Sequence, residues 1–314
     1  MSSDLARWYH SMTFIYANEW DDSVRVVGKY LVANDDVLDI TDGKIIAKSD
    51  KVTVKNGVLT LTSAKHGMIN TWDDWHLIPT SRPVFQQGDV KTIYVDIPGA
   101  DGQIDLTEAL SGYPTYKNRE GSLEFIVANG WRQNWATGFS QFANWLHGRV
   151  LRVILDDDPE YFYEGRFKLN EWKSNNDGTW SNVTIDYNLK PYKYSVYLST
   201  DRWLWDPFNF ETGFAYNGGN FTIDSADLGP SGETAIQINN DAMHVVPTFV
   251  IKNTTADKWT ITLNGNTVDI PIDQASTETR FKTPSLELVP GVNMVTIKTS
   301  SGGSIDILFR GGSL

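Results

Sequence analysis

The stretch Leu146 to Leu189, LHGRVLRVILDDDPEYFYEGRFKLNEWKSNNDGTWSNVTIDYNL, decides the fold of the first part of this chain. Leu151, Val153 and Leu155 alternate with other residues, which is the period of a β-strand. Large apolar residues alternate in the same way along 161–169 and along 183–189. Three consecutive runs of this kind predict a β-meander with a hairpin at its centre, and nothing in the stretch resembles a catalytic loop.

Two turn signals separate these runs. Asp156-Asp157-Asp158-Pro159 ends the first run, because proline fixes its own backbone and cannot donate to a ladder. Asn175-Asn176-Asp177-Gly178 separates the second run from the third, because asparagine and glycine tolerate positive φ. The third strand therefore returns antiparallel to the second.

A helix is expected just before the first strand. Phe139, Phe142 and Leu146 fall at the spacing i, i+3 and i+7, which is helical period. Thr137 is the candidate N-cap, and Gly148 is the candidate C′ residue. One helix beside several strands predicts an α+β or mostly β domain.

Three pieces of this region, LHGR, LDDDPEYFYEGRF and EWKS with GTWSNVTID, resemble the distal tail protein (Dit) family of long-tailed phages. Two upstream segments resemble the same family in the same order. They are NTWDDWHLIPTSRP at 70–83 and VDIPGADGQIDLTEALSGYPTYKNREG at 95–121. The resemblance therefore covers about residues 70–189.

The resemblance implies a structural component of the phage tail tip or baseplate. Such proteins form a hexameric ring through their N-terminal domains and join the tail tube protein to the tail-tip, or tail-associated, protein. In many phages they also carry the receptor-binding protein used for host attachment. The implied location is the distal end of the tail in the virion. The N-terminus, MSSDLARWYHSMTF, lacks the apolar segment of a secretory signal, which predicts synthesis in the host cytoplasm.

A prior of about 150 residues per domain predicts two domains for 314 residues. Residues 1–200 are expected to be the ring-forming hub domain, an α+β β-barrel or sandwich with one helix, which the resemblance implies is tail-tube-like. Residues 201–314 are richer in Gly, Asn, Thr and Ser, and short strand candidates recur there between turn residues. This pattern predicts a β-sandwich or jelly roll, and the resemblance implies a galectin-like one.

An inserted β module is expected at about residues 23–65, between two segments that adjoin in the resembling family. Val24, Val26, Tyr30 and Val32 are expected on one face of a strand that ends at an acidic turn. Asn56-Gly57 is expected to close a hairpin between 52–54 and 59–61. The module either contacts a neighbour or is a solvent-exposed decoration, and both interpretations remain open.

Composition excludes several classes of function. The net charge is −12 and no basic patch is evident, so direct binding to nucleic acid is not expected. The absence of Cys excludes disulfides and thiolate zinc sites. No apolar run reaches the roughly 18–20 residues of a membrane span. The sequence also contains no HExxH motif, no GxSxG elbow and no P-loop.

No catalytic residue, cofactor or metal is therefore expected, and the protein is not expected to be an enzyme. Asp156 to Asp158 could in principle bind calcium, but EF-hand spacing is absent and an acidic turn is the more ordinary interpretation. The adjacent acids Asp73 and Asp74 could suggest a glycosidase. In a strand they would point to opposite faces, which favours a turn and packing motif instead.

Candidates for contacts between subunits follow from charge and from the aromatic motif. They are Trp72, Asp73, Asp74, Arg119, Arg149 and Arg166. Ordinary surface ion pairs of little energetic value are the alternative interpretation of the arginines. A different function is a carbohydrate-binding adaptor that contacts host glycans through the C-terminal sandwich, with Trp259 as the stacking platform. Trp259 alternates in register with Ile261 and Leu263, which favours a core position instead.

Overall fold

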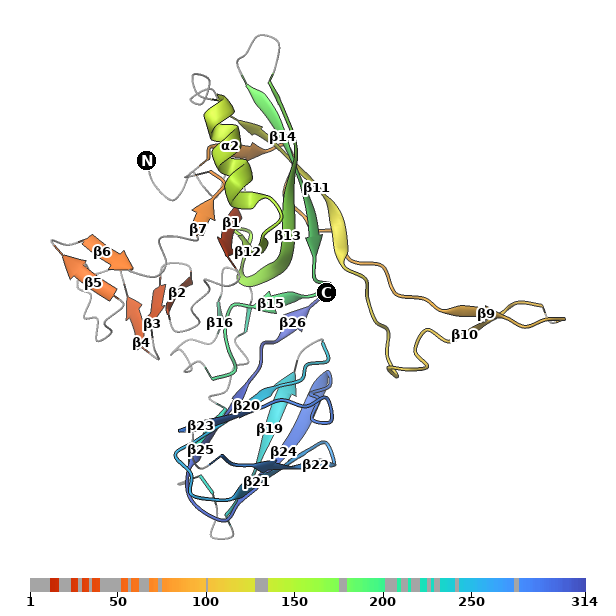
Figure 1. Cartoon of the computed structure of the whole chain (residues 1–314), viewed down its shortest axis with the longest axis vertical. Helices are drawn as coiled ribbons and strands as arrows, with labels where there is room; N and C mark the ends of the chain where they lie inside the picture. The colour runs from red at the N-terminus through yellow and green to blue at the C-terminus, as the bar shows by residue number, and fades with distance from the viewer. Residues whose placement is uncertain are drawn as a thin grey trace. The chain divides into compact units, whose positions relative to one another are not determined.

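The computed structural model describes residues 12–16, 24–27, 30–33, 36–39, 52–55, 58–61, 68–72, 75–99, 101–127, 135–174, 180–200, 208–209, 214–215, 221–224, 227–228, 232–240, 243–273 and 277–314. The chain divides into two compact units, residues 1–193 with Leu314 and residues 194–313. Strands dominate both units, which confirms the predicted mostly β fold class (Figure 1). The sequence places the domain boundary after residue 200, and the roles assigned to the two domains remain predictions.

Unit 1 is built on a strongly curled antiparallel sheet. Its strands are β1 (Met12–Tyr16), β7 (Met68–Asn70), β8 (Leu77–Pro79), β11 (Arg119–Val127), β12 (Val150–Leu155), β13 (Asp158–Ser174) and β14 (Ser181–Leu189). They follow one another in the order β7-β1-β12-β13-β14-β11-β8. The predicted meander forms its centre, since β12 pairs with β13 and β13 pairs with β14.

The two ends of this sheet are tied together near Thr71. Strands β7 and β8 lie at opposite ends of the strand order but only a few residues apart in the chain. The Thr71 N–H donates to Met12 O at 2.9 Å, and the Leu77 N–H donates to Thr71 O at 2.8 Å. The Thr71 hydroxyl also accepts from the Met12 N–H at 3.0 Å. These bonds give the sheet the closure of a barrel at this end.

The core of unit 1 lies inside the curled sheet and beneath the helix α2 (Trp135–Leu146). Phe14 meets Phe167 edge-on at 5.0 Å between ring centroids, and Phe142 of α2 meets Trp75 at 4.8 Å. Edge-to-face rings at these separations add to the stabilisation from buried area. The helix thus covers the sheet through aromatic contacts.

Several local predictions can be compared directly with the structure. The helix ends at Leu146 and Gly148 has φ +76°, as expected of a C′ glycine. The N-cap prediction is wrong, because Thr137 lies inside a helix that begins at Trp135. Pro159 was expected to separate the strands, but it lies near the start of β13, where the register with β12 shifts. Proline is tolerated there because a bulge leaves that position out of the ladder.

The segment 23–65, which the sequence predicts to be an inserted module, contains a three-stranded sheet of β2 (Val24–Val27), β3 (Tyr30–Ala33) and β4 (Asp36–Asp39). It also contains a hairpin of β5 (Val52–Lys55) and β6 (Val58–Leu61). The pairing of Lys55 with Val58 confirms the hairpin across Asn56-Gly57, although these two residues lie outside the described part. The prediction of one strand through Val24 and Val32 is wrong, because β2 pairs with β3.

Unit 2 contains two four-stranded antiparallel sheets that share one core. The first sheet has the order β18-β25-β20-β23 and the second has the order β19-β24-β21-β22. Their bounds are β18 Thr222–Asp224, β19 Glu233–Asn240, β20 Thr248–Lys252, β21 Lys258–Leu263, β22 Asn266–Pro271, β23 Glu278–Phe281, β24 Gly291–Thr299 and β25 Ser304–Leu308. The short pair β16 (Phe208–Asn209) with β17 (Phe214–Ala215) accompanies them, and β15 (Lys193–Ser195), at the division between the units, pairs with β26 (Gly312–Ser313).

This arrangement is the predicted sandwich, and its core residues come from both sheets. The sequence located most of the strands but missed β23. The apolar residues at 286–288 also predict a strand, but Leu288 forms only an isolated bridge with Val245. The galectin-like character of the sandwich remains a prediction.

Candidate functional site

A two-stranded arm extends from unit 1 between residues 89 and 117, apart from the curled sheet (Figure 1). Its ladder joins β9 (Tyr94–Asp96) and β10 (Gln103–Asp105), and among the described residues neither strand pairs with another sheet. Nearer the base, Lys91 N–H donates to Thr115 O and Lys117 N–H donates to Asp89 O, both at 2.8 Å. The arm is therefore a continuous ribbon of two chain segments.

The two faces of this arm differ in character. In the register, Val95 lies opposite Ile104, and Ile93 and Ile97 share the face of Val95 by strand alternation. The exposed fractions of Ile93, Val95, Ile97, Ile104 and Leu106 are 48%, 44%, 43%, 45% and 39%. The opposite face carries Tyr94, Asp96, Gln103 and Asp105, and Gln103 donates to Asp96 at 2.8 Å. One face is thus wholly apolar and open to solvent.

An isolated two-stranded hairpin is marginally stable in water, and a contiguous exposed apolar patch of this kind marks an interaction site. The arm continues into Leu110, which is 96% exposed. At its base, Gly88 approaches the backbone of Lys117 so closely that a Cβ would lie 2.1 Å from the carbonyl oxygen. The base is therefore built for close packing, whereas the outer part offers an uncovered apolar face.

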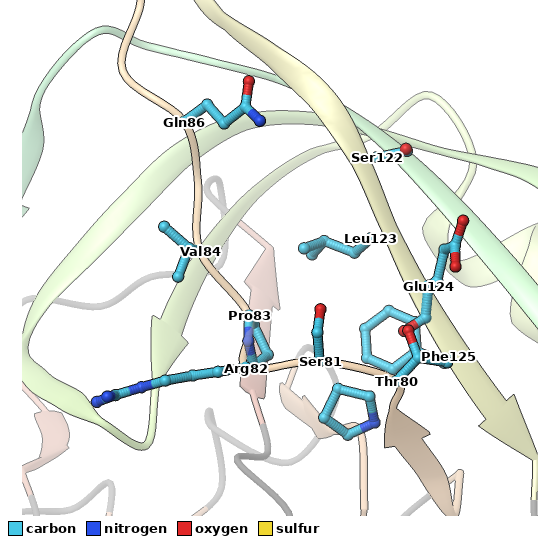
Figure 2. A pocket seen from close by; sticks show the side chains of 11 residues that line it. Thr80, Ser81, Arg82, Pro83, Val84, Gln86, Ser122, Leu123, Glu124 and Phe125 are labelled. Carbon is cyan, nitrogen blue, oxygen red and sulfur yellow. The ribbon is translucent and has the colours of Figure 1, made fainter.

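A slot lies at the root of this arm, beside β11. It has a volume of about 340 Å³ and lies between the segment 79–86 and residues 122–125. Figure 2 shows the two backbones standing apart, with the Leu123 side chain between them. The Thr80 N–H donates to Glu124 O at 2.9 Å at one end, and the Gln86 N–H donates to the Tyr187 hydroxyl at 3.3 Å at the other. These ties hold the segment at its ends and leave its middle away from β11.

Arg119, a predicted contact residue between subunits, is only 2% exposed. Its Nε donates to Pro191 O at 2.8 Å, and its NH1 group donates to Phe85 O at 3.1 Å. The guanidinium lies 5.4 Å from the centroid of the Tyr163 ring, and burial lowers its pKa. The hydrogen bonds of Arg119 therefore stabilise the far end of the slot within its own subunit, and its buried side chain is not accessible to a neighbouring subunit.

The other predicted contact residues are not brought together. Arg149 and Arg166 are exposed, and Arg166 NH1 donates to Gly148 O at 2.6 Å. Trp72 is half-buried and meets His76 edge-on at 5.7 Å between ring centroids. Asp73 and Asp74 lie outside the described residues. Contacts of Trp72, Arg149 and Arg166 with a second subunit remain proposals.

Trp259 lies in the core of the sandwich with 0% exposure. Its indole N–H donates to the Thr254 hydroxyl at 3.1 Å, so the polar edge of the ring also has a partner inside unit 2. A sugar-stacking platform needs an exposed ring face beside polar groups. Trp259 does not meet this requirement, because both faces of its ring are buried.

The acidic turn brings its carboxylates to basic side chains. Asp157 accepts from Arg82 at 2.9 Å, and Asp158 accepts from Lys193 at 2.7 Å. Within the described part of the chain, no cluster of three or more His, Cys, Asp or Glu residues is placed to hold a metal ion. In the same part, no helix is both long and apolar enough to cross a membrane.

Glu164 of β13 is held between two cations in a half-buried position. It accepts from Arg152 Nε at 2.9 Å and from Lys190 Nζ. Burial opposes ionisation of Glu164 and is the largest single influence, but the hydrogen bonds and charges of Lys190 and Arg152 together outweigh it. The pKa of Glu164 is therefore lowered from its ordinary value of 4.5.

Glu164→Gln is expected to lower the free energy of unfolding by about 1–2 kcal/mol at neutral pH, because hydrogen bonds to charged groups are lost. A folded-state pKa below the unfolded value stabilises the fold above the unfolded pKa. That stabilisation is lost as the pH falls through the folded pKa. The difference between wild type and variant should therefore shrink in acid, as measured by urea unfolding across pH. Glu171→Gln, in the exposed pair with Lys173, is the control and should change stability by less than about 0.5 kcal/mol.

The sequence suggested part of this site and missed the rest. From the sequence, the alternation of Ile93, Val95 and Ile97 predicts a strand, and residues 106–110 predict a helical turn with Asp105 as its N-cap. Asp105 is the last residue of β10 and accepts the Thr107 N–H at 2.9 Å, and the Ala109 N–H donates to Leu106 O at 3.1 Å, so a turn does follow the strand here. The alternation of Ile104 and Leu106 after the Pro98-to-Gly102 turn was the signal for the hairpin.

No protein-family model matches this sequence, and no curated protein matches it. Among solved structures, the chain is similar to the crystal structure of the Dit protein of phage SPP1. The sequence identity is 16%, the TM-score is 0.49, and the match covers 76% of this chain and 94% of that chain. The SPP1 protein is described as a paradigm of the hub adsorption apparatus in phages that infect Gram-positive bacteria.

Proposed function

We propose that this protein is a structural component of a phage tail tip or baseplate and that unit 1 assembles into a ring. The observation that carries the proposal is the apolar face of the arm, which its own subunit leaves exposed. Burial of this face against a second protein surface would lower the free energy, because it removes apolar area from water. The face is formed by Ile93, Val95, Ile97, Ile104 and Leu106. The occupant proposed here is a neighbouring copy of the same chain.

An arm that reaches one surface of a neighbour makes a heterologous contact, in which two different patches meet. Repetition of such a contact by a closing rotation produces a ring. The arm overlaps the segment 95–121 that resembles the Dit family, and the other resembling segments lie in the same unit. The hexamer, the tail tube and tail-tip proteins as partners, and the receptor-binding protein as a further partner are taken from that resemblance. They are part of the proposal.

Light scattering on the purified protein, with negative-stain images of the same fraction, tests this function. The expected result is a particle of 6 × 35.3 kDa, about 212 kDa, with six-fold symmetry and an open centre. Some ring proteins assemble only in the presence of a partner, so the measurement is repeated with the tail tube protein of the same phage. A chain that stays monomeric at every concentration, alone and with that partner, would contradict the proposal.

A further inference from the structure

Strand β11 has a free edge beside the slot. On one side β11 pairs with β14 along its full length, from Arg119 with Leu189 to Val127 with Ser181. On the other side it pairs with β8 only from Phe125 to Val127. The part of β11 from Arg119 to Ser122 therefore has no strand on its outer side among the described residues.

The register shows which backbone groups point to this free edge. Glu124 O accepts from the Thr80 N–H, so the backbone groups of Glu124 face away from β14. Residues two apart in a strand point to the same side, so the N–H and C=O of Ser122 and Glu120 also face the free edge. Within the described part of the chain, no backbone hydrogen bond from the segment 80–86 reaches Ser122 or Glu120.

The side chains of this edge set the chemistry of a partner strand. Leu123 and Phe125 point into the core, whereas Glu120, Ser122 and Glu124 are exposed on the outer face. Glu120 accepts a hydrogen bond from the Asn188 side-chain amide at 2.5 Å, and none of the ion pairs among the described residues includes Glu120 or Glu124. A strand added here would place every second side chain beside this row, and opposite charges in such positions are stabilising.

We infer that the free edge of β11 accepts an extended segment of another protein by strand addition. The fitting segment alternates apolar residues, which face the slot beside Leu123, with Lys or Arg, which face Glu120 and Glu124. This inference does not depend on ring formation. Its occupant is not the arm of a second copy, because residues 93–106 contain three aspartates and no basic residue to meet Glu120 and Glu124.

The test is fluorescence anisotropy with the full chain and a short labelled peptide of alternating lysine and valine. A peptide of alternating glutamate and valine is the comparison. We expect the lysine peptide to bind at least about tenfold more tightly. We expect Ser122→Pro to weaken that binding at least about tenfold, because proline removes the edge N–H and blocks a partner strand. Proline is tolerated at strand edges, and the Ser122 N–H has no backbone partner on that side among the described residues. Ser122→Ala keeps the N–H and should bind like wild type.

A protein with a net charge of −12 attracts any basic peptide, so charge reversal at the edge is needed to show that the lysine peptide binds at β11. Glu120→Lys with Glu124→Lys should reverse the preference, so that the glutamate peptide binds more tightly. Amide hydrogen exchange gives an independent measurement in the wild-type chain, where the lysine peptide should slow exchange at Glu120 and Ser122. Equal binding by Ser122→Pro, an unchanged preference after charge reversal, or unprotected amides at these two residues would overturn the inference.

Discussion

Val95→Asp combined with Ile104→Asp is expected to convert the assembled protein into a folded monomer. The two side chains lie opposite each other in the arm and are exposed in the subunit, so the change creates no cavity in the core. In the proposed ring they are covered, and two unpaired carboxylates would have to be buried there. We expect the association constant to fall at least about a hundredfold, which corresponds to about 2.7 kcal/mol.

Light scattering and sedimentation measure this loss, and thermal unfolding checks that the monomer is intact. The control is Tyr94→Lys with Gln103→Lys, which adds two charges to the opposite face of the same arm and places them opposite Asp105 and Asp96. That control should still assemble. If both double variants assemble like wild type, the apolar face of the arm is not the contact between subunits. If both fail equally, added charge on the arm decides assembly, and not the loss of its apolar face.

Trp259→Ala is expected to destabilise unit 2 by about 3–5 kcal/mol, the range for removal of a large aromatic side chain from a core. The ring is fully buried between the two sheets, and its loss leaves a cavity and removes the hydrogen bond from the indole N–H to the Thr254 hydroxyl. Since a typical domain is stable by about 5–15 kcal/mol, much of unit 2 is expected to unfold at moderate urea concentrations. Circular dichroism follows the transition without relying on the missing fluorophore.

Met294→Ala is the control, because Met294 is exposed on a strand of the same sheet as Trp259. It should change the stability by no more than about 0.5 kcal/mol. The pair of variants also bears on the carbohydrate-binding alternative. A Trp259→Ala protein with unchanged stability and a selective loss of binding on a glycan panel would contradict a core role. A role of Trp259 in stacking against a sugar would then be the better interpretation.

The candidate site was partly accessible from the sequence. The apolar alternation of Ile93, Val95 and Ile97 indicated a strand, but alternation does not tell whether its apolar face is covered. Arg119 was taken as a surface residue because arginine is usually exposed. Its register with Leu123 and Phe125 on the same strand would have placed it on the inner face. The hydrogen bonds to Phe85 O and Pro191 O that make this burial possible come from residues far away in the chain.

The sequence alone determined the mostly β class, the meander from residue 150 to 189, the end of the helix near Gly148 and most strands of the sandwich. These features depend on the two-residue period of a strand and on turn residues, which act over a few neighbouring positions. Only the tertiary structure decided the strand order, the closure at Thr71, the free edge of β11 and the open face of the arm. Each of these depends on which distant segments pair, and a local pattern is compatible with many such pairings.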